Sequence, residues 1–192
     1  MKGSRPLSRL QVKSLLQKTS SIREKVLLTL GFCTGYRISE LLSLTVGDVS
    51  TGGQIHSHVT VKASNTKTKT GRTVVLNSDA QKAIKLLLVS KGIDDPHSPL
   101  FMSRKRDQSG ERKSISRQQA HDLLKALFAK IGEFGNVSTH TLRKTFAARI
   151  YEQTSKLELV QIALGHKSIN STISYLAFGN EEVDRAIMCV IE

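Results

Sequence analysis

Residues 139–147 read Thr-His-Thr-Leu-Arg-Lys-Thr-Phe-Ala and place His140 three positions before Arg143. Residues three apart share one face of a helix, so this imidazole and this guanidinium can point at the same target. Arginine binds a phosphodiester through paired hydrogen bonds and stays charged at any working pH. Taken alone, a His and an Arg at this spacing are more often a surface pair or a helix cap. Together with the features below, they indicate a site that handles phosphate.

A histidine and a tyrosine follow nearer the C-terminus. Gly165 is placed to end a helix over residues 157–164, and His166 comes directly after it. Tyr175 stands nine residues after His166 in a short amphipathic segment. Tyrosine is one of the side chains that can act as a covalent nucleophile. Each feature has an ordinary structural explanation, but the combined spacing predicts phosphoryl transfer onto Tyr175.

The charge of the chain indicates a polyanionic partner. The 192 residues include 29 Lys and Arg against 16 Asp and Glu, which gives a net charge of +13 and a pI near 10.0. This balance is typical of proteins that bind nucleic acid. A charge that serves solubility, or a ribosomal type of RNA binding, is the alternative. The length predicts one domain, with two small lobes as the other possibility.

Membrane, disulfide and metal functions are not predicted. No apolar run is long enough to span a bilayer, and the N-terminus lacks the apolar core of a signal peptide, so we expect a soluble, cytoplasmic protein. Cys33 and Cys189 lie far apart in apolar settings and are interpreted as reduced core residues. His56 and His58 are two residues apart, but no further ligands stand near them in sequence. We therefore predict no metal site and no cofactor.

The N-terminal part is expected to be helical. Capping-box signatures at residues 8–11 and 21–24 predict two helices. The pair Thr34-Gly35 interrupts the second helix, and residues 38–44 resume a helical pattern. Arg37 stands at the start of this pattern, where backbone N–H groups and the helix dipole also favour an anion.

The following segment changes to β character. Val59 and Val61 alternate with polar residues, and residues 72–76 are rich in β-branched side chains, which predicts a β-hairpin with a possible third strand around Ile55. A turn is expected at residues 68–71. The tip region of the hairpin carries the cations Lys62, Lys67, Lys69 and Arg72. Such cations commonly hold the DNA backbone, and one of these lysines could serve as a general acid.

The second half of the chain combines helices with a basic loop. Asn77 is expected to cap a helix that Gly92 closes, and residues 116–119 form a capping box for a helix ended by Gly132. Residues 103–113 are polar and lack apolar periodicity. We expect this loop to lie along DNA phosphates through Arg104, Lys105, Arg106, Arg112 and Lys113. The pattern predicts an α+β fold that is mostly α-helical, with one small antiparallel sheet.

The C-terminal segment differs from the basic body of the chain. Residues 180–192 contain acidic side chains, and their apolar residues fall on one helical stripe, formed by Val183, Ile187, Val190 and Ile191. This stripe needs a surface to cover it, either on the same molecule or on a neighbour.

Together these residues resemble the catalytic domain of the tyrosine recombinases, the phage integrase family. Residues 34–41 are similar to the family's first arginine motif, which contains Arg37 and the supporting acid Glu40. Residues 139–143 are similar to its His-x-x-Arg motif, and residues 164–168 to its Leu-Gly-His box. Tyr175 stands at the spacing of the family's nucleophile. The resemblance covers nearly the whole chain.

The resemblance implies roles for these residues. Arg37 and Arg143 would contact the scissile phosphate, and Tyr175 would form a 3′-phosphotyrosine bond. His140 or His166 would assist Tyr175, and Lys144 would join the DNA-binding cations. The general acid would be Lys67, which we favour over Lys69 because Lys67 stands five residues before Arg72. No ATP, metal or other cofactor is implied.

The resemblance also implies partners and an organisation. Double-stranded DNA would be the substrate, in a bacterial or phage context, with a tetramer on paired DNA sites and tails exchanged between protomers. Residues 1–192 would form the catalytic domain without an N-terminal core-binding domain. The chain would then be either a piece of a longer recombinase or a short member similar to fimbrial-switch recombinases. A type IB topoisomerase activity and a non-catalytic DNA-binding regulator are the alternative functions.

Overall fold

The computed structural model describes residues 4–65, 71–106 and 108–176. Two compact units make up the chain, residues 1–146 and residues 147–192. The boundary between them falls inside one helix, α7 (Thr139–Thr154), so the sequence continues from one unit to the next without a linker.

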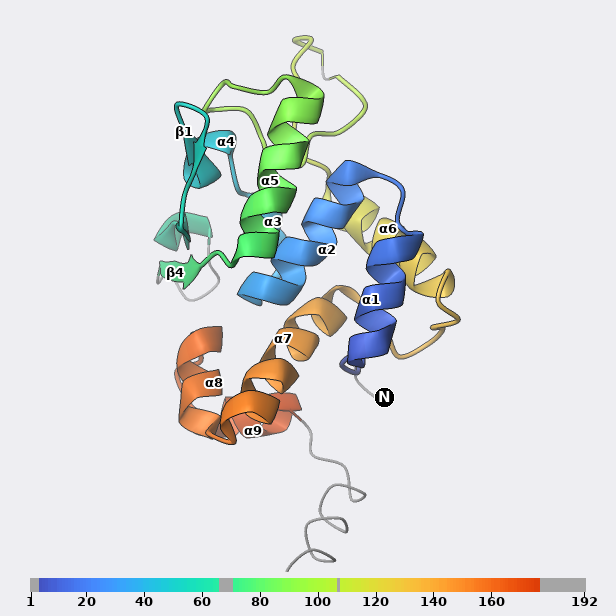
Figure 1. The fold of residues 1–192 in the computed structure, drawn as a ribbon, viewed down its shortest axis with the longest axis vertical. Helices are drawn as coiled ribbons and strands as arrows, with labels where there is room; N and C mark the ends of the chain where they lie inside the picture. The colour runs from blue at the N-terminus through green and yellow to red at the C-terminus, as the bar shows by residue number, and fades with distance from the viewer. Residues whose placement is uncertain (1–3, 66–70, 107, 177–192) are drawn as a thin grey trace, which may run out of the picture. The chain divides into compact units, whose positions relative to one another are not determined.

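Helices form most of the first unit (Figure 1). They are α1 (Arg9–Lys18), α2 (Ile22–Thr34), α3 (Ile38–Leu42), α4 (Val46–Val49), α5 (Ser78–Lys91), α6 (Arg117–Ala129) and the first turns of α7. The strands are β1 (Ser50–Thr51), β2 (Gln54–Ile55), β3 (His58–Val61) and β4 (Arg72–Val75), and a 3₁₀ turn covers Ala63–Asn65. The predicted mostly helical α+β fold is confirmed.

The capping residues explain where several helices begin. The Ser8 and Ser116 hydroxyls each accept a hydrogen bond from the backbone N–H three residues later, and the glutamine there reaches back. Asn77 caps α5 in a similar way. The prediction of a capping box at residues 21–24 is wrong, because the Ser21 side chain makes no capping hydrogen bond. Helix α6 also ends at Ala129, earlier than predicted, since Lys130 is already its C-cap.

The strands form two separate hairpins among the described residues. Strands β3 and β4 pair antiparallel, with Val59 opposite Val74 and Val61 opposite Arg72. Ile55 belongs to β2, which pairs with β1. The expected third strand therefore exists but is not part of the predicted hairpin. The turn expected at residues 68–71 lies largely outside the described residues.

The core of the first unit has two parts. In the larger part α2 packs against α5, and the two helices lie side by side in Figure 1. Leu30, Ile84 and Phe101 are buried there. The smaller part joins α1 and α6 to the start of α7 through residues such as Phe128 and Leu142. Apolar burial of this kind is the main stabilising contribution to a domain of this size.

Two glycines allow α7 to approach the end of α2 closely. A Cβ atom at Gly31 would lie 2.6 Å from Leu142 Cδ1, and one at Gly35 would lie 2.2 Å from Phe146 Cδ1. Gly35 also adopts a left-handed conformation, with φ of 59°, which glycine tolerates best. The sequence therefore places Arg143, between Leu142 and Phe146 on α7, directly beside the end of α2.

The second unit contains the rest of α7, α8 (Leu157–Leu164) and α9 (Ile169–Leu176). Gly165 ends α8 in a left-handed conformation, with φ of 65°, as predicted. Helix α9 packs against α8. No helix in the described part of the chain is both long and apolar enough to cross a membrane.

Candidate active site

A buried carboxylate anchors the first predicted arginine. Arg37 is the N-cap residue of α3, and Glu40 is the third residue of that helix. The Glu40 carboxylate accepts hydrogen bonds from the Arg37 backbone N–H at 2.7 Å and from Arg37 Nη1 at 2.8 Å. The Glu40 side chain is only 3% exposed, whereas that of Arg37 is 28% exposed. Glu40 thus binds both the backbone and the guanidinium of Arg37, whose side chain stays partly exposed.

The same carboxylate lies near the second predicted arginine. Arg143 is buried, with 2% of its side chain exposed, and its Nη1 lies 4.0 Å from Glu40 Oε2. Arg143 Nη1 also donates a hydrogen bond to the Gly35 carbonyl at 2.6 Å. Charged groups so well buried need such partners, because an unpaired buried charge is strongly destabilising. Glu40, predicted as a supporting residue, links both arginines.

His140 lies in the field of these cations. Its backbone N–H donates to the Ser138 hydroxyl in the first turn of α7. Desolvation lowers the pKa of His140, and the positive charges of Arg143, Arg37 and Lys144 lower it further. Both effects disfavour the charged imidazolium. The first unit thus brings Arg37 close to His140 and Arg143, which lie about a hundred residues later in the sequence.

The second unit brings together the other two predicted residues. The rings of His166 and Tyr175 meet edge to face, with centroids 5.5 Å apart and planes at 82°. His166 Nδ1 forms a hydrogen bond with the Thr172 hydroxyl at 3.1 Å. The packing of α9 on α8 thus turns the nine-residue spacing into a direct contact. The convergence of this pair with Arg37, His140 and Arg143 stays a prediction.

Lys67 is the remaining catalytic candidate, and Lys69 is the alternative to it. Lys67 and Lys69 lie outside the described residues. Lys62, which directly follows β3 and was predicted to bind DNA, is exposed. Their roles remain as predicted from the sequence.

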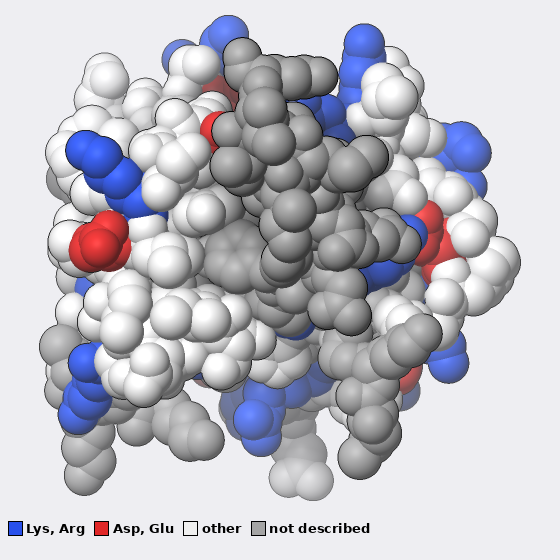
Figure 2. Space-filling model, turned by 90° about the horizontal axis from the view of Figure 1, so that it is seen from below, with Lys and Arg blue, Asp and Glu red and all other residues white. Residues whose placement is uncertain are grey.

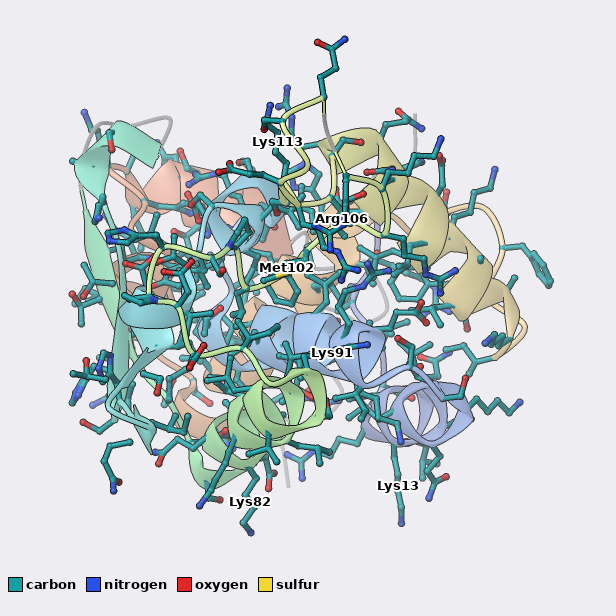
Figure 3. The ribbon with its side chains drawn as sticks, turned by 90° about the horizontal axis from the view of Figure 1, so that it is seen from above. Lys13, Lys82, Lys91, Met102, Arg106 and Lys113 are labelled. Atoms are coloured by element: carbon teal, nitrogen blue, oxygen red, sulfur yellow. The ribbon has the colours of Figure 1, made fainter. Side chains whose placement is uncertain are left out.

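The predicted basic loop is exposed to solvent. A hydrogen bond from the Ser103 N–H to the Lys113 carbonyl, 2.7 Å long, closes its base. The side chains of Arg104, Lys105, Arg112 and Lys113 are exposed, and Arg106 donates to the Gly110 carbonyl. Figure 3 labels Arg106 and Lys113 on this loop. Lys and Arg side chains also appear at several places on the face seen in Figure 2, with Asp and Glu at fewer.

Sequence reasoning missed the role of Tyr36. This residue is only 1% exposed, and its hydroxyl lies 2.7 Å from the Val59 carbonyl oxygen and 2.8 Å from that of Arg72. The Arg72 guanidinium stacks over the ring, 4.4 Å from its centroid. The available signal was an aromatic residue directly before the first arginine of the motif. Arg72 itself was predicted only as a DNA-binding cation.

The fold is that of tyrosine recombinase catalytic domains. A XerA recombinase superposes with a TM-score of 0.77 at 23% identity, covering 97% of this chain and 63% of that one. A XerH site-specific recombinase in a post-cleavage complex with a palindromic difH substrate gives 0.72 at 22% identity, with 98% and 54% covered.

Sequence comparison then identifies the family. The model of the phage integrase family matches residues 6–182, and the chain belongs to that family. The tyrosine recombinase XerC of Pelobacter propionicus is 31% identical over 159 residues, which are 83% of this chain and 49% of the relative. The chain thus spans about half the length of that relative. A probable integrase/recombinase of Bacillus subtilis, YoeC, is 31% identical over 182 residues, with 95% and 92% covered.

Proposed function

We propose that this chain is the catalytic domain of a site-specific DNA recombinase that cleaves and rejoins strands through a 3′-phosphotyrosine intermediate. The observation that carries the proposal is the buried Glu40, which holds Arg37 and lies beside Arg143. Two fixed guanidinium groups are suited to a phosphodiester. Family membership supports the proposal, as does the DNA complex of the similar XerH.

The proposed reaction is a transesterification at phosphorus. The Tyr175 oxygen attacks the scissile phosphate and forms a bond to phosphorus, while the bond from phosphorus to the 5′ oxygen breaks. The phenol loses its proton to a base, and the leaving 5′ oxygen gains one from a general acid. Attack by the 5′ hydroxyl of another strand reverses these steps and restores a phosphodiester.

Arg37 and Arg143 stabilise the charge that builds on the non-bridging oxygens. Donors that are already oriented stabilise a transition state better than donors that must reorganise. Burial of Arg143 and its bond to the Gly35 carbonyl provide this orientation. Arg37 is more exposed and can therefore reach an incoming phosphate.

The proton transfers fall to the histidines and a hairpin lysine. Desolvation and neighbouring cations lower the pKa of His140, which favours the neutral imidazole that can accept a proton or a hydrogen bond. His166 contacts the Tyr175 ring and is the second candidate for this role. Lys67 is the proposed acid for the 5′ oxygen. Because the phosphotyrosine conserves the energy of the broken bond, the reaction as proposed needs neither ATP nor a divalent metal.

We further propose double-stranded DNA, in the bacterial cytoplasm, as the partner of the basic loop. Recombination between two sites would require a tetramer, with residues 180–192 docked on neighbouring protomers. These residues lie outside the described part of the chain.

A nicked suicide substrate tests the proposal. A nick close to the cleavage point makes the fragment that carries the new 5′ hydroxyl very short. This fragment diffuses away after cleavage, so the protein stays covalently attached to the DNA. We expect a covalent adduct that maps to Tyr175. Transfer of a labelled strand to a second duplex separates recombination from simple nicking and rejoining. Binding without any adduct would instead favour a non-catalytic regulator.

A further inference from the structure

The turn that carries Arg37, residues 34–37, is held by side chains from two distant parts of the first unit, β4 and α7, and by its own Tyr36. Its first carbonyl, that of Thr34, accepts a hydrogen bond from Arg72 Nη2 at 3.1 Å. Its second, that of Gly35, accepts one from Arg143. The Tyr36 side chain reaches across to the hairpin β3–β4. We call residues 34–37 the arginine turn.

Arg72 contacts this turn in two ways at once. Its guanidinium donates to the Thr34 carbonyl while its face stacks on the Tyr36 ring. Contacts of a cation with an aromatic face strengthen when the cation is shielded from water. Burial lowers the pKa of Arg72, which reflects this shielding. Burial also raises the pKa of Tyr36 to about 12, so the phenol stays protonated and donates its hydrogen bond.

Strand parity explains why Arg72 points inward. Along β4 the exposure alternates, with Arg72 and Val74 half-buried and Thr73 and Val75 exposed. Alternate residues of a strand face the same side of a sheet, so Arg72 shares the covered side with Val74. The side chains of Arg104, Lys105, Arg112 and Lys113 in the basic loop are exposed instead. Arg72 is therefore placed to contact groups of the protein itself, the Thr34 carbonyl and the Tyr36 ring.

We infer that Arg72, stacked on Tyr36, is a positioning residue that couples the β3–β4 hairpin to the arginine turn and so sets the direction of Arg37. This inference rests on the proposed function, because it assigns the pair a part in the same reaction. The coupling has two connections. Arg72 joins β4 to Thr34, and the Tyr36 hydroxyl joins the turn to carbonyls on β3 and β4.

The chemistry of the pair requires these residue types. A guanidinium is planar, so it can stack on a ring and donate hydrogen bonds at its edge simultaneously. A lysine would keep the charge but lose that combination. If Arg72 instead contacted DNA as a simple charge, lysine would replace it well. The Arg72→Lys variant therefore distinguishes positioning from direct phosphate binding.

The test compares Arg72→Lys with Lys82→Gln, a control that removes an exposed charge pointing away from α5 (Figure 3). Single-turnover covalent attachment to suicide DNA is measured at saturating DNA, together with Kd and its salt dependence. We expect attachment by Arg72→Lys to slow on the order of 100-fold, as misplaced catalytic groups do. Its Kd and salt dependence should stay close to those of the unchanged protein. An unchanged attachment rate would overturn the inference. So would a variant that binds DNA more weakly but attaches at the normal rate once the DNA is saturating.

A double-mutant cycle identifies the residue through which Arg72 acts. In an Arg37→Ala background, Arg72→Lys should slow attachment far less than it does alone, because the group being positioned is gone. Equal losses in both backgrounds would mean that Arg72 acts independently of Arg37, contrary to the inference.

A second variant covers the case in which Arg72→Lys fails to fold. Tyr36→Phe keeps the ring beneath the guanidinium and removes only the hydroxyl. We expect slower attachment at unchanged DNA affinity, and an unchanged rate would contradict the inference. Covalent attachment by the unchanged protein, measured in the same assay, tests the proposed function separately. If that protein forms no adduct, the proposed function fails; if it does and these variants match it, only the positioning role fails.

Discussion

The arginine turn and the basic loop, residues 103–113, both carry arginines, but the fold treats them differently. In the turn, the Arg37 backbone and side chain bond to the buried Glu40 carboxylate. The Thr34 and Gly35 carbonyls accept hydrogen bonds from Arg72 and Arg143. In the loop, the cations are exposed, and one bond between Ser103 and Lys113 closes the base. Fixed cations are suited to stabilising the charge of a transition state. Solvated cations instead contribute DNA affinity, which salt weakens.

The largest effect is expected from a substitution at the nucleophile, which lies in neither the arginine turn nor the basic loop. Tyr175→Phe should abolish covalent attachment, because it deletes the attacking oxygen. The ring remains, so its edge-to-face contact with His166 can persist. DNA binding should be nearly unchanged, since no cation is lost. Denaturing gel electrophoresis of protein on suicide DNA measures the adduct, and an adduct at another residue would disprove the assignment of Tyr175.

Removing a fixed arginine should affect rate far more than affinity. We expect Arg143→Ala to slow attachment at saturating DNA about 10²- to 10³-fold, as loss of a preorganised donor does elsewhere. Arg149→Ala is a control on the same helix, because Arg149 pairs with the nearby Glu152 at 2.9 Å. Thermal melting of both variants checks that the fold persists. If Arg143→Ala weakened DNA binding without slowing attachment, the arginine turn and the basic loop would not differ in function.

Removing cations from the basic loop should have the opposite signature. Replacing Arg104, Lys105 and Arg106 with Ala should weaken binding and reduce the slope of log K against log salt by about one for each lost phosphate contact. Sequence preference should not change. Titrations of two different duplexes at several salt concentrations measure both quantities. If the slope is unaffected, these side chains do not contact phosphates.

The smallest expected effect is a shift in a pH profile. Lys144 is one of the cations that lower the pKa of His140. Lys144→Met removes a charge that disfavours the protonated imidazole, so the pKa of His140 should rise. If the neutral imidazole is the active form, the acid limb of the rate profile should move to higher pH. Single-turnover rates across the acidic range measure the shift, and movement to lower pH would contradict it.

Much of this fold was predictable because its signals are local. The caps of α1, α5 and α6 each depend on residues three apart, and Gly165 ends α8 where it was expected. Local signals failed at two places. Ser21 has the sequence of a cap without the bond, and the strand at Ile55 pairs with β1. Strand pairing depends on segments that the local pattern does not specify.

By itself the sequence determined which residues are candidates for the proposed chemistry, because the motif spacings place His140 and Arg143 on one helix and Tyr175 shortly after His166. The tertiary structure decided which cations are fixed and which are solvated. Arg72 and Arg104 look alike in the sequence, but strand register turns Arg72 onto Tyr36 while Arg104 is exposed. The physical reason is that burial of a charge depends on what packs against it, and those partners come from distant parts of the chain.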